Sequence, residues 1–479
     1  MTLKLTKQLQ AIICVVIAGA FFFVNPLGVK PEAATVIAFA VLMILLWVTE
    51  AVPMPVVALL PLVLFPLFKI NSIEATAAGY ANPVIFLFMG GFMLGLAIEK
   101  CNLHRRIALN IVRLTGTSGN RIILGFIIST GLISMWLSNT ATTMMMFPIA
   151  LSVVKVIESN HLQKEGVKNF ALSIMIAIAL ASNFGGIATL IGTPPNVAYA
   201  AFINKKYNYS IAFIDWMLLC MPLTILLLFS LYIVLVKWLY PNRMRSDEST
   251  TAIIRNEVIG LGAYSKAEKR VLIIFCCTAF LWMTKDLLNQ YIPLKLDDNM
   301  IALMGAITLF IIPNGKNGDA LLEWSDTKNM AWGILLLFGG GIALAGALEK
   351  AGLMQQLGLW FAGFASNTLL LIFMVTVISL FISEVMSNVA QVIVFAPVVS
   401  ALAEAAHIHP LQLGIPMTLA ASCASMLPMG TPPNAIAFSS GYIRLKDMTR
   451  VGFAMNIISV ILITLFCWLL LPLVIPLSP

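Results

Sequence analysis

Two polar breaks interrupt the apolar stretches of this chain, and each break occurs twice. Ser138-Asn139-Thr140 is followed by Gly192-Thr193-Pro194-Pro195-Asn196, and later Ser387-Asn388-Val389 is followed by Gly430-Thr431-Pro432-Pro433-Asn434. At membrane depth, backbone that leaves the helix has N–H and C=O groups without partners unless protein, water or a ligand satisfies them. Matching interruptions in the two halves of a membrane chain therefore indicate a binding site for a polar ligand.

Composition places these breaks inside a membrane protein. Of the 479 residues, 60% are hydrophobic and 10% are charged, whereas soluble domains carry about 25% charged residues. The apolar stretches are long enough to cross about 30 Å of hydrocarbon as helices. The first of them lacks a small-residue cleavage site, so we interpret it as a retained helix. We expect an all-α polytopic membrane protein.

The hydropathy pattern predicts eleven transmembrane helices and two re-entrant helical hairpins. The helices are expected at 8–25, 32–50, 53–68, 82–99, 170–203 (broken at Gly192), 215–236, 270–289, 296–313, 330–348, 410–440 (broken at Gly430) and 450–477. The hairpins are expected at 122–157 and 368–404, and a Ser-Asn motif interrupts each of them in the middle.

The second half of the chain repeats the first in the opposite orientation. The segment from Gly90 to Lys100 matches the segment from Gly340 to Lys350, in addition to the matching breaks. Five predicted crossings separate each element from its copy, and because five is odd the copies point in opposite directions. The expected units are an N-terminal helix (1–31), a first repeat (32–236), a cytoplasmic connector (237–269) and an inverted second repeat (270–479).

Lys and Arg residues gather in the predicted loops of one side. Examples are the run from Lys100 to Arg121 in one predicted loop and the run from Lys237 to Lys269 in the connector. Because basic loops stay in the cytoplasm, the N-terminus is expected inside and the C-terminus outside, in a plasma membrane (a bacterial inner membrane). The same loops account for the net charge of +8 without a nucleic-acid partner.

The residues of the Gly-Thr-Pro-Pro-Asn breaks favour the start of a new helix. Gly leaves the backbone torsions free, Thr is a preferred N-cap and Pro is favoured at the first helical position. One helix should therefore end near Ile191 and the next begin at Pro194, while Ser138 or Ser387 can cap the second arm of each hairpin. Helix N-termini at the breaks would face an anion, and carbonyl and side-chain oxygens would suit a small hard cation such as Na⁺. No Arg or Lys lies near the breaks.

Together these motifs resemble the divalent-anion:sodium symporter family, the group of dicarboxylate, citrate and sulfate transporters. The resemblance rests on Met135 to Thr142, on Gly192 to Asn196, on Ser383 to Asn388 and on Leu427 to Asn434, and it extends over nearly the whole chain. It implies a homodimer in the lipid bilayer, with a scaffold domain and a transport domain that moves as an elevator. It also implies a structural role for Glu384, hydrogen-bonded within the transport domain.

The resemblance further implies which residues bind the ions and the substrate. One Na⁺ site would use Ser134, Ser138, Asn139 and Gly192, and a second would use Ser383, Met386 through its carbonyl, Asn388 and Gly430. Substrate carboxylates would meet Ser138, Asn139, Thr140, Thr193, Pro194, Ser387, Asn388, Val389, Thr431 and Pro432. The sequence departs from the family pattern at Val389 and Gln391, where Thr is commoner, and Val389 removes a hydroxyl from the expected site.

The expected function is Na⁺-coupled import of a di- or tricarboxylate such as succinate, malate, fumarate or citrate, with at least two Na⁺ ions. A Na⁺-independent dicarboxylate exchanger and a symporter of sulfate or another divalent anion are the alternatives. Exchange would need another positive charge at the site, such as a Lys or His in place of a Na⁺ ligand, and the motifs contain neither. An intramembrane enzyme is not expected, because HExxH, GxSxG and paired acids or His residues are absent from the apolar regions.

Overall fold

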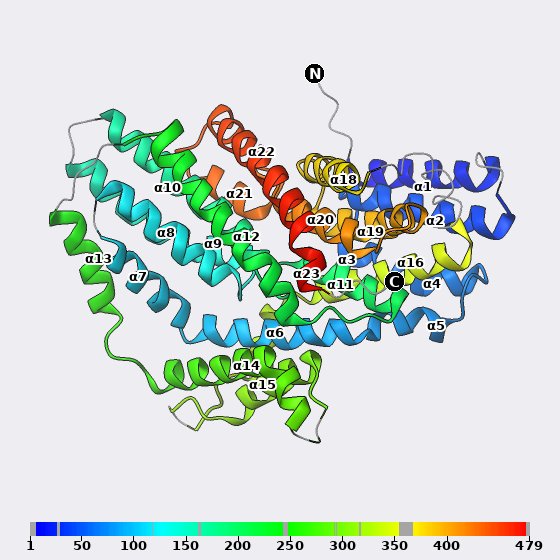
Figure 1. The fold of residues 1–479 in the computed structure, drawn as a ribbon, viewed down its shortest axis with the longest axis horizontal. Helices are drawn as coiled ribbons and strands as arrows, with labels where there is room; N and C mark the ends of the chain where they lie inside the picture. Colours follow the sequence, from blue (N-terminus) through cyan, green and yellow to red (C-terminus); the bar gives the residue numbers. More distant parts are fainter. Residues whose placement is uncertain are drawn as a thin grey trace.

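The computed structural model describes residues 6–25, 29–116, 118–160, 164–242, 248–291, 293, 295–315, 318–353 and 367–475. Within these ranges the regular structure is helical, and an isolated antiparallel bridge joins Pro313 to Ala320. The predicted all-α architecture is confirmed for this part of the chain (Figure 1).

The helices follow one another in two long series. The first contains α1 (Lys7–Val24), α2 (Pro31–Thr49), α3 (Met54–Val57), α4 (Leu60–Leu67), α5 (Ile73–Ala77), α6 (Pro83–Lys100), α7 (Leu103–Thr115), α8 (Gly119–Ser134), α9 (Asn139–Asn160), α10 (Lys164–Gly186), α11 (Pro194–Tyr207) and α12 (Phe213–Ile233). The second contains α13 (Glu248–Gly260), α14 (Lys266–Tyr291), α15 (Asp298–Ile311), α16 (Trp332–Lys350), α18 (Thr368–Ser383), α19 (Asn388–Ala405), α20 (Leu411–Ser422), α21 (Pro432–Phe438), α22 (Leu445–Leu469) and α23 (Leu471–Val474).

Within the described ranges, ten helices are long and apolar enough to cross a membrane. Two of the nine crossings that were expected as unbroken helices are not single long helices. Residues 53–68 form α3 and α4, and the region 296–313 holds the shorter α15 of 14 residues. Pro61 explains the first of these differences, because it has no N–H to bond to the carbonyl of Val57 four residues earlier.

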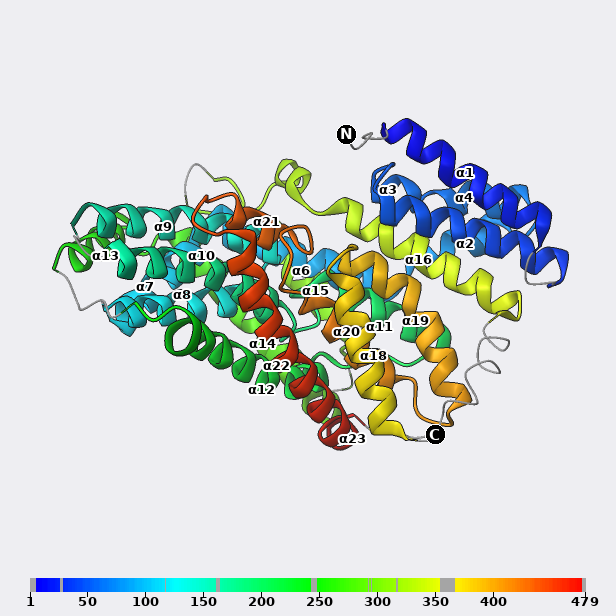
Figure 2. The ribbon, with the colours of Figure 1, turned by 90° about the horizontal axis from the view of Figure 1, so that it is seen from above.

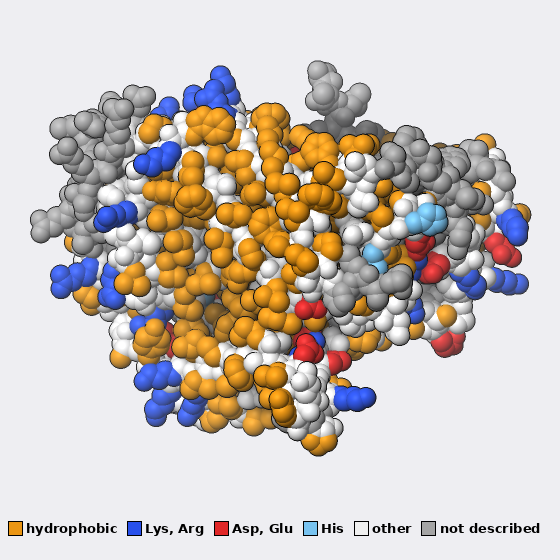
Figure 3. Space-filling view, in the orientation of Figure 1, with side chains coloured by type: hydrophobic (Ala, Val, Ile, Leu, Met, Phe, Trp, Pro, Cys, Tyr) orange, Lys and Arg blue, Asp and Glu red, His pale blue; other side chains and the backbone are white. Residues whose placement is uncertain are grey.

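An apolar outer face on α22 fits contact with lipid. Phe453, Ile457, Ile461 and Leu465 are all exposed, and their spacing of four residues places them on one side of the helix. Figure 3 shows hydrophobic side chains spread over the centre of this face of the molecule, with Lys and Arg gathered toward its edges. A soluble protein rarely exposes so large a continuous apolar surface.

The basic segment after α6 is a helix, where the sequence predicted a loop. In α7, Leu103, Ala108, Leu109 and Val112 are buried, while Arg113 is exposed. This one-sided burial is typical of an amphipathic helix that packs on its neighbours through one face. The charge run concealed the apolar spacing in the sequence.

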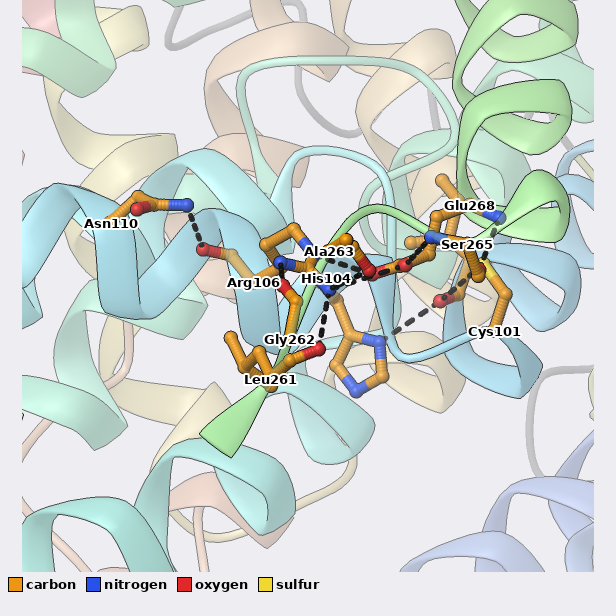
Figure 4. A network of polar contacts seen from close by, with 10 residues as sticks. Cys101, His104, Arg106, Asn110, Leu261, Gly262, Ala263, Ser265 and Glu268 are labelled. Carbon is orange, nitrogen blue, oxygen red and sulfur yellow. Dashed lines mark hydrogen bonds and ion pairs between the residues drawn. The ribbon is translucent and has the colours of Figure 1, made fainter. Parts of the chain in front are cut away.

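Arg106 of α7 is buried and joins this helix to the segment before α14 (Figure 4). Its Nε donates to Glu268 Oε1 at 2.6 Å, and its Nη1 and Nη2 donate to the carbonyl oxygens of Gly262 and Leu261, each at 2.9 Å. The guanidinium carbon also lies 4.4 Å from the centre of the Tyr264 ring. The planar guanidinium thus satisfies a carboxylate and a turn of backbone at once.

The second parts of the two broken helices pack on the opposite halves of the chain. From the first half, α11 contacts α19 and α20 of the second, whereas α21 of the second half contacts α9 and α10 of the first. Figures 1 and 2 both place α11 beside α19 and α20 and α21 near α10. Within the first half, α8 and α10 also approach closely, since a Cβ on Gly185 of α10 would lie 2.3 Å from the Gly131 oxygen of α8. The breaks therefore meet where the two halves cross.

Candidate functional site

All four predicted breaks in the helices are present. The hairpin arms end and restart between Ser134 and Asn139 and between Ser383 and Asn388. New helices begin at Pro194 and Pro432, as the Gly-Thr-Pro-Pro pattern predicts. The helix before the first of these ends at Gly186, and the expectation of an end near Ile191 was wrong, because residues 187–193 form turns.

A cavity of about 770 Å³ lies at the meeting point of the breaks. Its walls include all ten residues expected to contact a substrate: Ser138, Asn139, Thr140, Thr193, Pro194, Ser387, Asn388, Val389, Thr431 and Pro432. Of the residues expected to bind Na⁺, Ser138, Asn139, Met386, Asn388 and Gly430 also line the cavity. Ser134, Gly192 and Ser383 are buried beside these residues and are not part of the lining.

Oxygen atoms gather behind the tip of the first hairpin. Ser134 Oγ donates to Asn139 Oδ1 at 2.8 Å. Thr189 Oγ1 donates to the Met135 carbonyl oxygen at 2.5 Å and accepts the Gly192 N–H at 3.1 Å. Gly192 is required here, because a Cβ would lie 2.9 Å from the Met135 oxygen. Hydroxyl, amide and carbonyl oxygens of this kind are the ligands that hard cations prefer.

The second hairpin holds a matching oxygen cluster. Ser383 Oγ lies 2.7 Å from Asn388 Oδ1 and also 2.7 Å from the Ala421 carbonyl oxygen. Its single hydroxyl hydrogen can be donated to only one of them, which leaves two oxygens in close contact without a shared hydrogen. A small cation would relieve the repulsion between them.

The caps at the breaks differ between the two halves. Ser138 Oγ accepts the Ala141 N–H at 3.2 Å, and Thr431 Oγ1 accepts the Asn434 N–H at 3.3 Å. The equivalent residues, Ser387 and Thr193, accept no such side-chain cap bond. The hydroxyls of Ser387 and Thr193 therefore remain available to the cavity that both residues line.

Glu384 supports the second break from behind. It is 3% exposed, and its carboxylate accepts the backbone N–H groups of Ser425, Met426 and Leu427 at 2.8 to 3.1 Å, together with Asn456 Nδ2 at 2.7 Å. The three backbone donors lie in the non-helical segment between α20 and α21, where the carboxylate supplies the acceptor that a helix would otherwise provide. The expectation that Glu384 is hydrogen-bonded within the fold is confirmed.

A third Ser-Asn motif, at Asn367, has a different role from the two repeated ones. The triplet Ser366-Asn367-Thr368 has the same composition as the first hairpin motif. Asn367 caps α18 by accepting the N–H groups of Leu369 and Leu370 at 2.9 and 3.3 Å, and it does not line the cavity. Ser366 lies outside the described residues.

The two departures from the family pattern occupy different places. Val389 lines the cavity, whereas Gln391 is fully buried and donates through Nε2 to the carbonyl oxygen of Ser379 at 2.8 Å. Val389 is thus placed to influence a ligand directly, and Gln391 links the two arms of the second hairpin.

Sequence reasoning missed Asn183 and Glu50 as parts of the cavity wall. Asn183 is a buried amide that follows Ser182 in a mostly apolar stretch of α10, which is the signal that could have found it. Glu50 ends α2 with a left-handed φ of 48° and, among the described residues that line the cavity, is the one with a charged side chain. Its place in the cavity wall depends on tertiary packing that no local pattern specifies.

The lining can hold an anion only through neutral donors and co-bound cations. The described lining contains no Lys, Arg or His. In the same part of the chain, no group of three or more His, Cys, Asp or Glu side chains could hold a metal ion. The available chemistry is therefore that of hydroxyls, amides, helix N-termini and the two oxygen clusters.

Comparison with known proteins gives concordant matches in sequence and in fold. A family described as the sodium:sulfate symporter transmembrane region matches residues 4–475. A sodium-dependent dicarboxylate transporter, SdcS, of Staphylococcus saprophyticus is 37% identical over 458 residues, covering 94% of this chain and 88% of that protein. The protein of the same name from Staphylococcus aureus strain USA300 is 37% identical over 462 residues, with the same coverage.

Solved transporter structures share the fold at low sequence identity. The YdaH transporter of Alcanivorax borkumensis matches with a TM-score of 0.56 at 12% identity, covering 84% of this chain and 89% of that one. MtrF of Neisseria gonorrhoeae matches with a TM-score of 0.55 at 12% identity, covering 84% of each chain. At this identity the likeness concerns the fold alone.

Proposed function

The chain belongs to the family of the sodium:sulfate symporter transmembrane region, and we propose that it is a Na⁺-coupled symporter of small dicarboxylates such as succinate, malate or fumarate. It is an integral membrane transporter and not an enzyme. The dicarboxylate specificity draws on the two staphylococcal relatives, whose names state it.

One observation carries the proposal. The ten residues expected to meet the substrate line a single cavity, and the Ser134–Asn139 and Ser383–Asn388 oxygen pairs lie beside it, one from each half of the chain. The described lining offers a dianion no Lys or Arg partner, so its charge would have to be balanced by ions that arrive with it. Two Na⁺ ions, one at each oxygen pair, would neutralise a substrate of charge −2.

The size and the charge of the cavity favour this function over the alternatives. At about 770 Å³, the cavity is far larger than sulfate needs and accommodates a di- or tricarboxylate, including citrate. An exchanger without cation coupling would require a fixed positive charge, and the described lining supplies none.

We propose that the cavity opens to the cytoplasm in this structure. Besides the hairpin tips, its walls include Glu50 at the end of α2 and Ile334 at the start of α16. From the distribution of basic loops we expect both helix ends at the cytoplasmic face. Outward opening would then require the hairpin domain to move against α2 and α16, which fits an elevator-type transport domain on a scaffold, within a homodimer.

The proposed function is tested by uptake into proteoliposomes that contain the purified protein. Labelled succinate, citrate and sulfate are supplied outside, with and without an inward Na⁺ gradient. We expect succinate uptake to require the gradient and to exceed sulfate uptake. Equal uptake with internal unlabelled succinate and no Na⁺ would establish an exchanger, and preferential sulfate uptake would refute the dicarboxylate specificity.

A further inference from the structure

Asn183, in the first half of the chain, is hydrogen-bonded to the part of the cavity wall that the second half contributes at the start of α21. It is 1% exposed on α10 and lines the cavity. Its Nδ2 donates to Thr431 Oγ1 at 3.1 Å and to Asn434 Oδ1 at 3.2 Å. Both amide hydrogens are therefore used on the first turn of α21.

The orientation of this amide is set by a chain of hydrogen bonds that begins at a backbone carbonyl. Asn434 Nδ2 donates to the Leu427 carbonyl oxygen at 3.1 Å. A carbonyl oxygen can only accept a hydrogen bond, so the Asn434 amide nitrogen faces Leu427 and its Oδ1 faces Asn183. Asn183 must therefore donate to that Oδ1 through its Nδ2. The same Nδ2 is then a donor, and not an acceptor, toward Thr431.

The hydroxyl of Thr431 can consequently act toward the cavity only as a hydrogen-bond donor. Its oxygen accepts from Asn183 Nδ2 at 3.1 Å and from the Asn434 backbone N–H at 3.3 Å. A hydroxyl has two acceptor positions and one hydrogen, so with both positions occupied only the hydrogen is free. Thr431 lines the cavity, and among the hydrogen bonds of the described residues it donates none.

We propose that Asn183 is a positioning residue that fixes the Thr431 hydroxyl as a hydrogen-bond donor to a carboxylate of the substrate. This inference rests on the proposed function and deepens it. An obligate donor favours an ionised carboxylate and disfavours any ligand group that would itself have to donate at this position.

The first half of the chain lacks the equivalent arrangement. Aligning the two Gly-Thr-Pro-Pro-Asn motifs without gaps places Ala421 opposite Asn183, and alanine has no side-chain donor. Asn196, the counterpart of Asn434, donates to the Thr189 carbonyl oxygen at 2.9 Å, while its Oδ1 has no hydrogen-bond partner among the described residues. The Thr431 hydroxyl is thus fixed as a hydrogen-bond donor to the cavity, whereas the Thr193 hydroxyl can either donate or accept.

A double-mutant cycle in proteoliposomes tests the inference. We compare wild type, Asn183→Ala, Thr431→Val and the double variant by the KM and kcat of Na⁺-driven succinate uptake. Each single variant should raise KM about tenfold, as for loss of a hydrogen bond to a charged group, with a smaller effect on kcat. The double variant should match Thr431→Val, because Asn183 acts through the hydroxyl that Val lacks.

Control variants separate this role from a general structural one. Thr431→Ser keeps the hydroxyl and should retain a KM near that of wild type, and Asn110→Ala on α7 should leave KM unchanged. Additive effects of the two single variants would overturn the inference, as would an unchanged KM in Thr431→Val, which can be measured even if Asn183→Ala fails to fold. A wild type without Na⁺-driven succinate uptake would instead refute the proposed function.

Discussion

Asn139 and Asn388 carry the greatest share of the proposed chemistry at the scale of single residues. Each presents its Oδ1 to a serine hydroxyl, at 2.8 and 2.7 Å, and each lines the cavity. One side chain can therefore hold a Na⁺ ion with its oxygen and a carboxylate with its amide hydrogens. The sequence predicted this pair because the motif is repeated, and a single Ser-Asn motif would have been indistinguishable from the cap at Asn367.

Asn139→Ala and Asn388→Ala should each abolish or severely impair succinate uptake, because each removes a ligand from both an ion and the substrate. The measurement is initial uptake rate in proteoliposomes, with folding checked by size-exclusion profile. Asn367→Ala is the matched control and should transport at nearly the wild-type rate, since Asn367 only caps α18. Equal losses in all three variants would show that the site is misplaced.

Val389→Thr should change substrate preference while leaving transport intact. The two side chains have nearly the same size, and the new hydroxyl would face the cavity that Val389 lines. One additional hydrogen bond contributes about 0.5–1.5 kcal/mol, which corresponds to roughly a two- to tenfold gain in apparent affinity for succinate. The ratio of succinate to citrate uptake measures the change, and an unchanged ratio would place residue 389 out of reach of the substrate.

Among the helices, the sequence predicted the starts after the breaks correctly, but it misplaced the end of α10 and missed the amphipathic helix α7. Pro194 and Pro432 start helices as expected, because proline at the first position and Thr at the N-cap act locally. The end of α10 at Gly186 was misjudged, since the turns after it are held by contacts with Met135 that no local signal reveals. The helix α7 was missed because its basic residues resemble a loop.

Arg106→Ala should destabilise the protein by about 3–5 kcal/mol, because it leaves the buried carboxylate of Glu268 and the carbonyl oxygens of 261–263 without their donor. The measurement is the thermal unfolding temperature in detergent. The adjacent Arg105→Ala removes an exposed pair with Glu257 and should change stability by no more than about 1 kcal/mol. Similar unfolding temperatures for the two variants would contradict the role assigned to the Arg106 network.

At the scale of the whole molecule, the cavity results from the crossing of the two halves. The internal repeat predicted that the breaks would be equivalent, and α11 and α21 bring them together by packing on the opposite halves. The participation of Glu50 and Ile334 could not be predicted, because it depends on how the hairpins sit against α2 and α16. The proposal that the cavity opens to the cytoplasm rests on the same two residues.

An introduced Ile334→Cys should react with a membrane-impermeant thiol reagent from the cytoplasmic side when substrate is absent. The variant is made in a background without the seven native cysteines and labelled in right-side-out and inside-out vesicles. Saturating succinate and Na⁺ should slow the labelling by filling the cavity. Labelling from the outside alone would contradict the proposed orientation of the cavity.

The Na⁺ dependence of succinate uptake is the sharpest test of coupling between the two oxygen clusters and the substrate. With two oxygen clusters acting together, the initial rate in proteoliposomes should rise more steeply than first order with external Na⁺ concentration, and replacement of Na⁺ by K⁺ or choline should abolish uptake. Full transport with K⁺ or choline in place of Na⁺ would contradict the account.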